Sequence, residues 1–168
     1  KIKLQVKING EIKFNNFENP NIEEYIKDGK YIQQYNTWRE EMNKKYEIAE
    51  LDDEIDYKKN EAIYDECKFD NLLDIDLKLY TFPNYFRKVF VHMLRNEIIY
   101  IKTSYIDYLI QGQCELSNIG KINDLDNPKL VEIYIHLYEF LQKPSFGKYS
   151  YEEKLEKMKE YKKIADDC

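Results

Sequence analysis

Cysteine and histidine, the residues most often used for metal binding and nucleophilic catalysis, are few and widely spaced in this chain. The cysteines are Cys67, Cys114 and Cys168, and the histidines are His92 and His136. No two cysteines have the Cys-x-x-Cys spacing of a zinc site, and no other ligands cluster beside them. We therefore expect reduced thiols, no metal and no other cofactor. We expect His92 to be exposed and His136 to be a packed or surface histidine without a catalytic role.

Aromatic and acidic side chains offer a second kind of chemistry, the binding of an apolar ligand. Tyr64, Phe82 and Phe86 could line a pocket, although aromatic residues at such spacing usually belong to a core. Asp65 could contact a ligand from the pocket wall, or it could make local hydrogen bonds at the end of a strand. The residues alone leave both alternatives open.

The overall charge makes some classes of partner poor candidates. The 168 residues include 26 Lys and Arg and 32 Asp and Glu, which gives a net charge of -6. An acidic chain with interspersed lysines is a poor binder of nucleic acid phosphates. No apolar run reaches the roughly 18 residues of a membrane span, so we expect no membrane association. The reduced thiols favour a cytoplasmic protein. The charged stretch 47–59 is expected to be a solvated loop, with partner binding as the alternative.

The elements that would position these residues begin with a hairpin. Residues 2–14 alternate between apolar and polar on both sides of Asn9-Gly10, which is a strong hairpin signal. Residues 15–30 are expected to form a loop with a helical turn near 22–25. Further strands are predicted at residues 31–35, 45–51, either 66–73 or 74–79, 97–102 and 130–140.

A change of period predicts a helix within residues 82–95. Phe86, Val89, Phe90 and Met93 recur at i, i+3, i+4 and i+7, which places them on one helix face. Pro83 suits the first turn of such a helix, where its missing N–H costs nothing.

A second helix is predicted at the C-terminal end. Residues 143–149 read as a linker, and Ser150 with Glu153 then forms a capping box. The helix that follows has one narrow apolar stripe and is too short to be stable alone. It therefore packs on this domain or on helices outside the chain.

Together these elements predict an α+β fold with a mainly antiparallel sheet. We expect an N-terminal hairpin and loop over residues 1–30, which belongs to this domain or to a preceding one. A strand-rich domain with one central helix follows over residues 31–142, then the linker at 143–149 and the helix at 150–168.

Five stretches, taken in order, form a pattern that resembles a known family. They are residues 62–65 (AIYD), 82–93 (FPNYFRKVFVHM), 99–105 (IYIKTSY), 130–140 and 150–154 (SYEEK). In this order they resemble the FKBP family of peptidyl-prolyl isomerases, most closely the domain that precedes the tetratricopeptide repeats of large immunophilins. The resemblance covers about residues 31–165.

The resemblance implies a twisted antiparallel sheet wrapped around one short helix, with the ligand pocket between them. The family's reaction is rotation about an X-Pro bond, whose barrier is about 18–20 kcal/mol. An apolar, partly desolvated pocket lowers this barrier by binding the twisted peptide more tightly than the planar one. The reaction needs no cofactor.

When the pocket residues of the family are matched one by one to this sequence, some of them are kept. Tyr64 stands where the family has phenylalanine, and Asp65 matches the family's aspartate. Phe86 takes the place of the tryptophan that floors the pocket, and it is smaller. Tyr64 and Phe86 would keep an aromatic wall.

The rest of the pocket departs from the family. Phe82 and Pro83 replace a Val-Ile pair whose isoleucine donates its backbone N–H to the ligand, and proline has no N–H. The position of a second family tyrosine falls on Asp107, or on Tyr108 after a slip of one residue. The aromatic residue of the last strand falls near Ile133.

These departures predict a degenerate FKBP-like domain that acts as a protein-interaction module in a chaperone-associated immunophilin. The resemblance implies that adjoining repeats bind a heat shock protein 90 type chaperone. The alternative is an active but divergent isomerase that uses Tyr64, Asp65, Phe82, Phe86 and Tyr108. A third hypothesis is an α+β interaction domain that is unrelated to the family.

Overall fold

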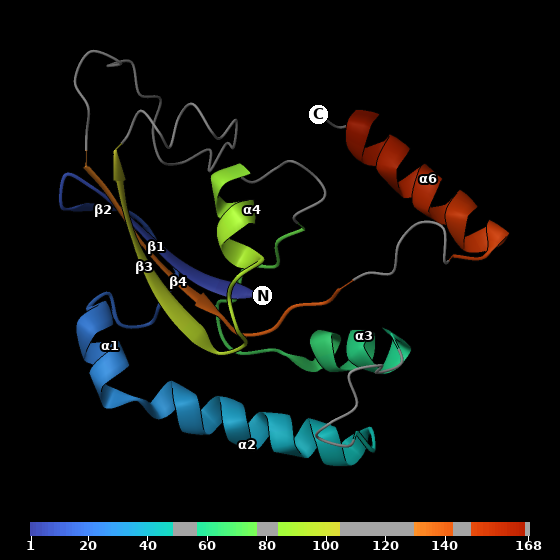
Figure 1. The fold of residues 1–168 in the computed structure, drawn as a ribbon, viewed down its shortest axis with the longest axis horizontal. Coiled ribbons are helices and arrows are strands. Elements are labelled where there is room, and N and C mark those ends of the chain that lie inside the picture. Colours follow the sequence, from blue (N-terminus) through green and yellow to red (C-terminus); the bar gives the residue numbers. More distant parts are fainter. Residues whose placement is uncertain (49–56, 77–83, 105–129, 143–148, 167–168) are drawn as a thin grey trace.

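A four-stranded antiparallel sheet lies at the centre of the molecule (Figure 1). The structure, a computed structural model, describes residues 1–48, 57–76, 84–104, 130–142 and 149–166. The strands are β1 (Ile2–Ile8), β2 (Glu11–Asn15), β3 (Glu97–Ser104) and β4 (Leu130–Leu137). Their order in the sheet is β2-β1-β4-β3, and every neighbouring pair is antiparallel. The predicted α+β class with an antiparallel sheet is confirmed.

The predicted N-terminal hairpin is also confirmed. Asn9 and Gly10 connect its strands with φ values of 51° and 81°, the left-handed backbone that favours these two residue types. β1 pairs with β2 on one side and with β4 along its whole length on the other, from Ile2 opposite Leu137 to Ile8 opposite Val131. The hairpin therefore lies in the same sheet as β3 and β4.

Five helices are described around this sheet. They are α1 (Ile22–Asp28), α2 (Lys30–Lys45), α3 (Tyr57–Glu66), α4 (Asn84–Phe90) and α6 (Tyr151–Asp166). The central helix predicted within residues 82–95 is confirmed by α4, although α4 is shorter. Gly29 separates α1 from α2 and has a φ of 65°, which a glycine adopts without strain.

Four sequence-based expectations between residues 15 and 73 are wrong. The strand predicted at 31–35 lies in helix α2, because Tyr31, Tyr35, Trp38 and Met42 form one helical stripe over a longer window. Residues 57–59, expected in a charged loop, begin α3, and α1 extends beyond the predicted turn. At 66–73 only an isolated bridge between Leu73 and Ile2 is present.

Two other predicted strands lie partly outside the described residues. In the stretch 45–51, Lys45 ends α2 and residues 46–48 are not a strand, whereas residues 49–51 are not described. In the stretch 74–79, residues 74–76 are not a strand and residues 77–79 are not described.

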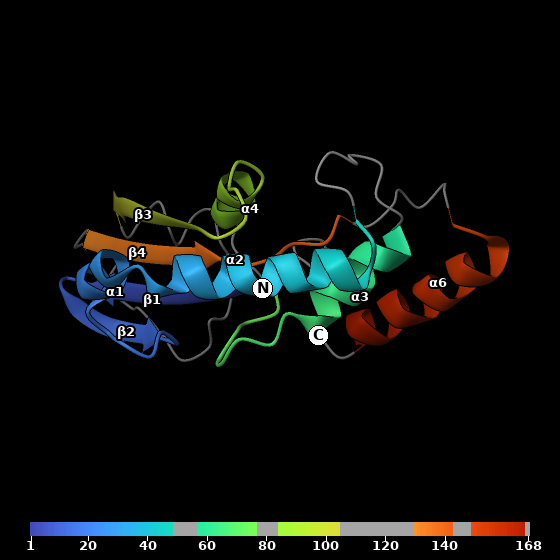
Figure 2. The same cartoon turned by 90° about the horizontal axis from the view of Figure 1, so that it is seen from below.

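The two faces of the sheet are covered by different helices (Figures 1 and 2). On one face the alternate residues are apolar, and α4 packs over them with Phe86. Their buried members are Ile2, Leu4, Val6, Ile8, Ile101, Val131, Ile133, Ile135 and Leu137. On the opposite face the alternate residues are largely polar, and α1 and α2 run along it. This division into an apolar and a polar side organises the rest of the molecule.

Helix α6 begins as the sequence predicts. The backbone N–H of Glu153 donates to Ser150 Oγ at 3.2 Å, and the N–H of Ser150 donates to Glu153 Oε2 at 2.7 Å, which is a complete capping box. Both views place α6 apart from the sheet, on the side of α3 (Figures 1 and 2). None of the helices in the described part of the chain combines the length and hydrophobicity needed to cross a membrane.

Candidate functional site

The space between α4 and the sheet is where the resemblance to the FKBP family would put a prolyl pocket. Phe86 of α4 and Ile133 of β4 meet there in one apolar cluster. In the sheet, Ile133 lies between Val6 of β1 and Ile101 of β3. Both Phe86 and Ile133 have exposed fractions of 0%. The two residues therefore fill a core, and neither offers a surface to a ligand.

The aromatic neighbour of Phe86 strengthens this packing. The ring of Phe90, one turn later in α4, stacks on Phe86 with the centroids 6.3 Å apart. Met93, just beyond the helix, is also buried in the cluster. The other two pocket candidates, Phe82 and Tyr108, lie outside the described residues.

Tyr64 and Asp65 lie elsewhere, on helix α3. The hydroxyl of Tyr64 donates to the Asp74 carboxylate, and Lys1 Nζ lies 4.8 Å from the centre of its ring. Burial and the Asp74 carboxylate both raise the pKa of Tyr64. Asp65 is exposed to solvent. Neither residue belongs to the apolar cluster around Phe86 and Ile133, so the structure does not gather the four described candidates into one pocket.

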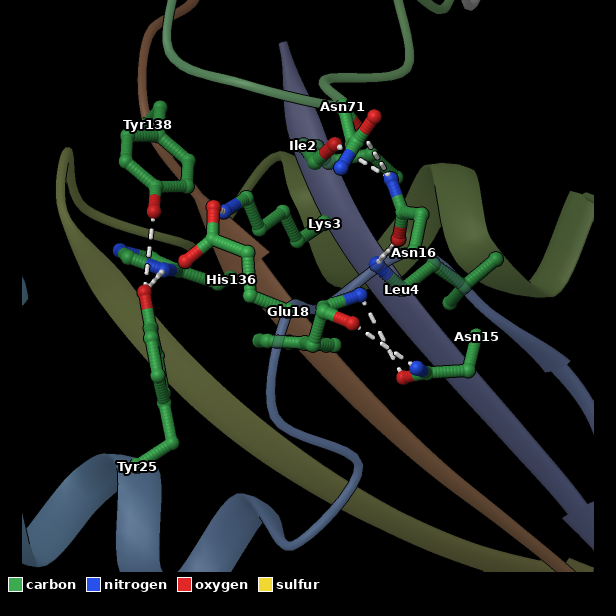
Figure 3. Close-up of polar contacts among 11 residues, drawn as sticks. Ile2, Lys3, Leu4, Asn15, Asn16, Glu18, Tyr25, Asn71, His136 and Tyr138 are labelled. Carbon is green, nitrogen blue, oxygen red and sulfur yellow. Dashed lines mark hydrogen bonds and ion pairs between the residues drawn. The ribbon is translucent and has the colours of Figure 1, made fainter.

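A polar cluster that the sequence did not predict covers the opposite face of the sheet (Figure 3). Lys3 and Gln5 of β1 and His136 of β4 are buried, with exposed fractions of 2%, 0% and 0%. By alternation these positions should face solvent, because their neighbours along the strands are the apolar core residues. Helices α1 and α2 cover them instead.

His136 is held by hydrogen bonds at both ring nitrogens. Nε2 lies 2.8 Å from Asn96 Oδ1, and Nδ1 lies 3.0 Å from the hydroxyl of Tyr25. An amide oxygen only accepts, so Nε2 carries the proton and Nδ1 accepts from Tyr25. The hydroxyl of Tyr138 then donates to that of Tyr25 at 2.9 Å. The hydrogen-bonded chain therefore runs from Tyr138 through Tyr25 and His136 to Asn96.

This series of hydrogen bonds can stabilise the fold but is not suited to proton transfer. Burial, helped by the positive charge of Lys3, lowers the pKa of His136 to about 3. Burial raises the pKa of Tyr25 to about 12. Both groups therefore stay neutral at ordinary pH, and the imidazole has no exposed surface from which to reach a substrate.

The segment between β2 and α1 is fixed to the same face by side-chain hydrogen bonds. Lys3 Nζ forms an ion pair with Glu18 at 2.8 Å. Gln5 Nε2 donates to the backbone oxygen of Pro20 at 2.8 Å and to Asn15 Oδ1 at 3.2 Å. Asn16 accepts from the N–H of Leu4 and donates to the backbone oxygen of Asn71 (Figure 3). These contacts tie the entry of α1 to strand β1.

The buried carboxylate of Glu139 links one end of the sheet to helix α2. Glu139, 2% exposed, forms ion pairs with Arg39 of α2 and with Arg95, which precedes β3. Tyr35 of α2 also donates its hydroxyl to Glu139, at 3.2 Å. Glu139 therefore connects helix α2 to the start of β3 and the end of β4, which lie at the same end of the sheet.

A depression of about 460 Å³ opens beside the polar cluster. Its lining residues are Lys7, Ile12, Pro20, Asn21, Ile22, Glu23 and Tyr134. They include no cysteine, serine or histidine that could act as a nucleophile or general base.

The described part of the chain shows neither a group of metal ligands nor a reactive thiol. No group of three or more His, Cys, Asp or Glu side chains there is arranged to hold a metal ion. Cys67 is buried, and burial raises the pKa of its thiol to about 11, so it is a poor nucleophile.

Comparison with known proteins gives no match. No protein-family model fits the chain, and no curated protein or solved structure is significantly similar to it.

Proposed function

We propose that this chain is an FKBP-like protein-interaction module whose peptidyl-prolyl isomerase activity is weak or absent. Support for the arrangement comes from the order and packing of α4, β3 and β4. Among the described elements these three come in this order along the chain, and α4 packs on the apolar side of an antiparallel sheet. The resemblance implies the same relation between its short helix and its sheet.

The burial of Phe86 and Ile133 carries the argument against strong catalysis. A prolyl ring can be bound only where apolar side chains remain open to it, whereas these two have no exposed surface. Pro83 adds a chemical reason, since it has no backbone N–H to donate to a bound peptide. Without tight binding of the twisted peptide, the rotation barrier is not lowered.

The test is the rate of prolyl cis/trans exchange in a short X-Pro peptide, measured by exchange NMR at high protein concentration. We expect no acceleration over the peptide alone, while an active FKBP-family isomerase in a parallel sample accelerates exchange. The spectrum of the protein itself must show that it is folded. Acceleration that a macrolide inhibitor abolishes would establish the alternative, an active divergent isomerase.

The proposed setting is a cytoplasmic complex with a heat shock protein 90 type chaperone, through repeats of which α6 is the first helix. The support is the capping box of α6 and its exposed stripe, in which Tyr151, Leu155 and Met158 have exposed fractions of 75%, 40% and 58%. Such a stripe is suited to packing against a neighbouring helix.

This setting is tested by the affinity of the purified full-length protein for the purified chaperone. Replacing Leu155 and Met158 with glutamate should weaken binding. The matched control is Val91→Glu, which changes an exposed apolar residue on another element. Equal affinities for the three proteins, or no binding by any of them, would remove the chaperone from the proposal.

A further inference from the structure

The two outer strands of the sheet differ in how well they are protected from pairing with another strand. β2 has five residues, includes the charged Glu11 and Lys13, and pairs with β1 through an irregular register at Val6 and Lys7. Short length, charge and bulges are the usual means by which proteins block an edge strand. β2 therefore has the features of a closed edge.

β3 lacks most of these features. It has eight residues and pairs with β4 in unbroken register from Glu97 opposite Leu137 to Ser104 opposite Leu130. Most of its residues favour strands and suit a sheet interior, namely Ile98, Ile99, Tyr100, Ile101 and Thr103. Within the described residues no strand pairs with its outer side. Among the described residues, alternate backbone N–H and C=O groups of β3 between Glu97 and Thr103 therefore have no strand partner on that side and are available to a new one.

The side chains of β3 define what a further strand would meet. On the apolar side of the sheet, Ile101 is 9% exposed and Ile99 is packed against the core. On the polar side, Tyr100 is 47% exposed and its ring lies 4.8 Å from that of Tyr134. Lys102 is exposed on this side and forms no ion pair among the described residues. An added strand would thus meet Ile99 and Ile101 on one face. On the other it would meet Ile98, Tyr100 and the Lys102 cation, with Glu132 of β4 directly across from Lys102.

We propose that the outer edge of β3 binds an extended segment of a partner protein as a fifth strand of the sheet. The segment would alternate apolar residues, facing Ile99 and Ile101, with polar ones, and would carry an acidic residue beside Lys102. Backbone hydrogen bonds would provide affinity, and the alternating side chains would provide specificity. This inference rests on the proposed role as an interaction module and names its contact surface.

The probe is a synthetic peptide of about eight residues, the usual length of a long strand, with the sequence acetyl-TVTVEVTV-amide. Its binding is followed by the amide chemical shifts of the protein. We expect saturable shifts confined to β3, its partner β4 and the flanking turns. Shifts centred on β2 or α6, or no shifts at all, would overturn the proposal.

Two N-methylated peptides provide the decisive control. One carries methyl groups on the amides of its odd-numbered residues and the other on those of its even-numbered residues. Only one of these two sets points towards β3 in an added strand, so one peptide should lose binding and the other should keep it. Equal behaviour of the two peptides would mean that side chains alone hold the segment, and would contradict strand addition.

Charge reversal tests the polar side of the contact. Lys102→Glu should weaken binding of the glutamate peptide by roughly fivefold and should favour a peptide with lysine in its place. The matched control is Lys13→Glu on the β2 edge, which should leave both affinities unchanged.

Dimerisation of the protein through β3 in the absence of peptide would assign the edge to a second copy and overturn the proposal. Prolyl exchange is measured separately, so failure of the peptide to bind leaves the test of isomerase activity intact.

Discussion

His136 lies on the polar side of the sheet with both ring nitrogens hydrogen-bonded and no surface exposed. A buried polar group is tolerated when its partners are in place and becomes costly when one is removed. The rings of Tyr25 and Tyr31 both pack against the imidazole, with centroids 5.9 Å and 4.9 Å away. Only Tyr25 also provides a hydrogen bond, and this difference gives a matched pair of variants.

Tyr25→Phe should destabilise the protein by about 1–3 kcal/mol, because it leaves His136 Nδ1 without a donor and the Tyr138 hydroxyl without an acceptor. Tyr31→Phe should have little effect, since the Tyr31 hydroxyl has no hydrogen-bond partner among the described residues. The measurement is urea-induced unfolding of both variants and the parent protein. Equal losses for the two variants would contradict the hydrogen-bonded chain.

The same histidine predicts how stability depends on pH. In the unfolded chain its pKa is about 6.5, whereas burial lowers it to about 3 in the folded protein. Between these values the unfolded state binds the extra proton, so stability falls as the pH drops below about 6.5, by up to about 1.4 kcal/mol per pH unit. In His136→Gln this contribution is absent. Urea unfolding of both proteins at several pH values between 7 and 5 should give the steeper loss for the parent protein. Parallel curves would show that His136 is accessible to protons when folded.

Local patterns explain which elements could be predicted from the sequence. The hairpin at Asn9-Gly10, helix α4, strands β3 and β4 and the capping box of α6 each depend on neighbouring residues. Residues 31–35 alone do not distinguish helix α2 from a strand, because a window of five residues with two tyrosines fits both. Only the longer spacing to Trp38 and Met42 indicates the helix.

The polar cluster could not be predicted for a different reason. Tyr25 and His136 are 111 positions apart in the chain, and Tyr35 and Glu139 are 104 apart. No local pattern reports that helices α1 and α2 cover this face. Of the pocket candidates, Phe86 and Ile133 do meet, but as parts of a filled core, and their burial depends equally on contacts between distant strands.

At the scale of elements, Glu139 predicts how strongly helix α2 is held to the sheet. Glu139→Gln removes the negative charge shared by Arg39 and Arg95 in a site that is 2% exposed. Breaking a buried ion pair on one side costs about 3 kcal/mol, so the unfolding midpoint in urea should drop markedly.

The control for this variant is an ion pair of the same charge types at the surface. Glu66→Gln breaks the pair between Lys45 and Glu66, whose side chains are 55% and 32% exposed. Water screens this pair, so stability should change little. A loss as large as that of Glu139→Gln would show that the location of Glu139, between α2 and the sheet, gives it no special importance.

At the scale of the whole molecule, stability should be unevenly distributed. β1 and β4 lie in the middle of the sheet, with neighbours on both sides and buried side chains on both faces. α6 has exposed apolar residues and lies apart from the sheet (Figure 1). Regions with few buried contacts open locally at low free energy, whereas central strands open only when the whole domain unfolds.

In native-state hydrogen exchange, the amides of the different elements should therefore exchange in a fixed order. The amides of β1 and β4 should exchange last, and their opening free energy should equal that of global unfolding measured in urea. In the 168-residue chain the amides of α6 should exchange much faster, because a helix of 16 residues without a partner helix is only marginally stable in water. In β3, alternate amides should exchange quickly, since only every second N–H is bonded to β4. Protection of all the β3 amides would mean that its outer edge is already covered in solution, and protection of α6 equal to that of β4 would mean that the helix is docked on the domain.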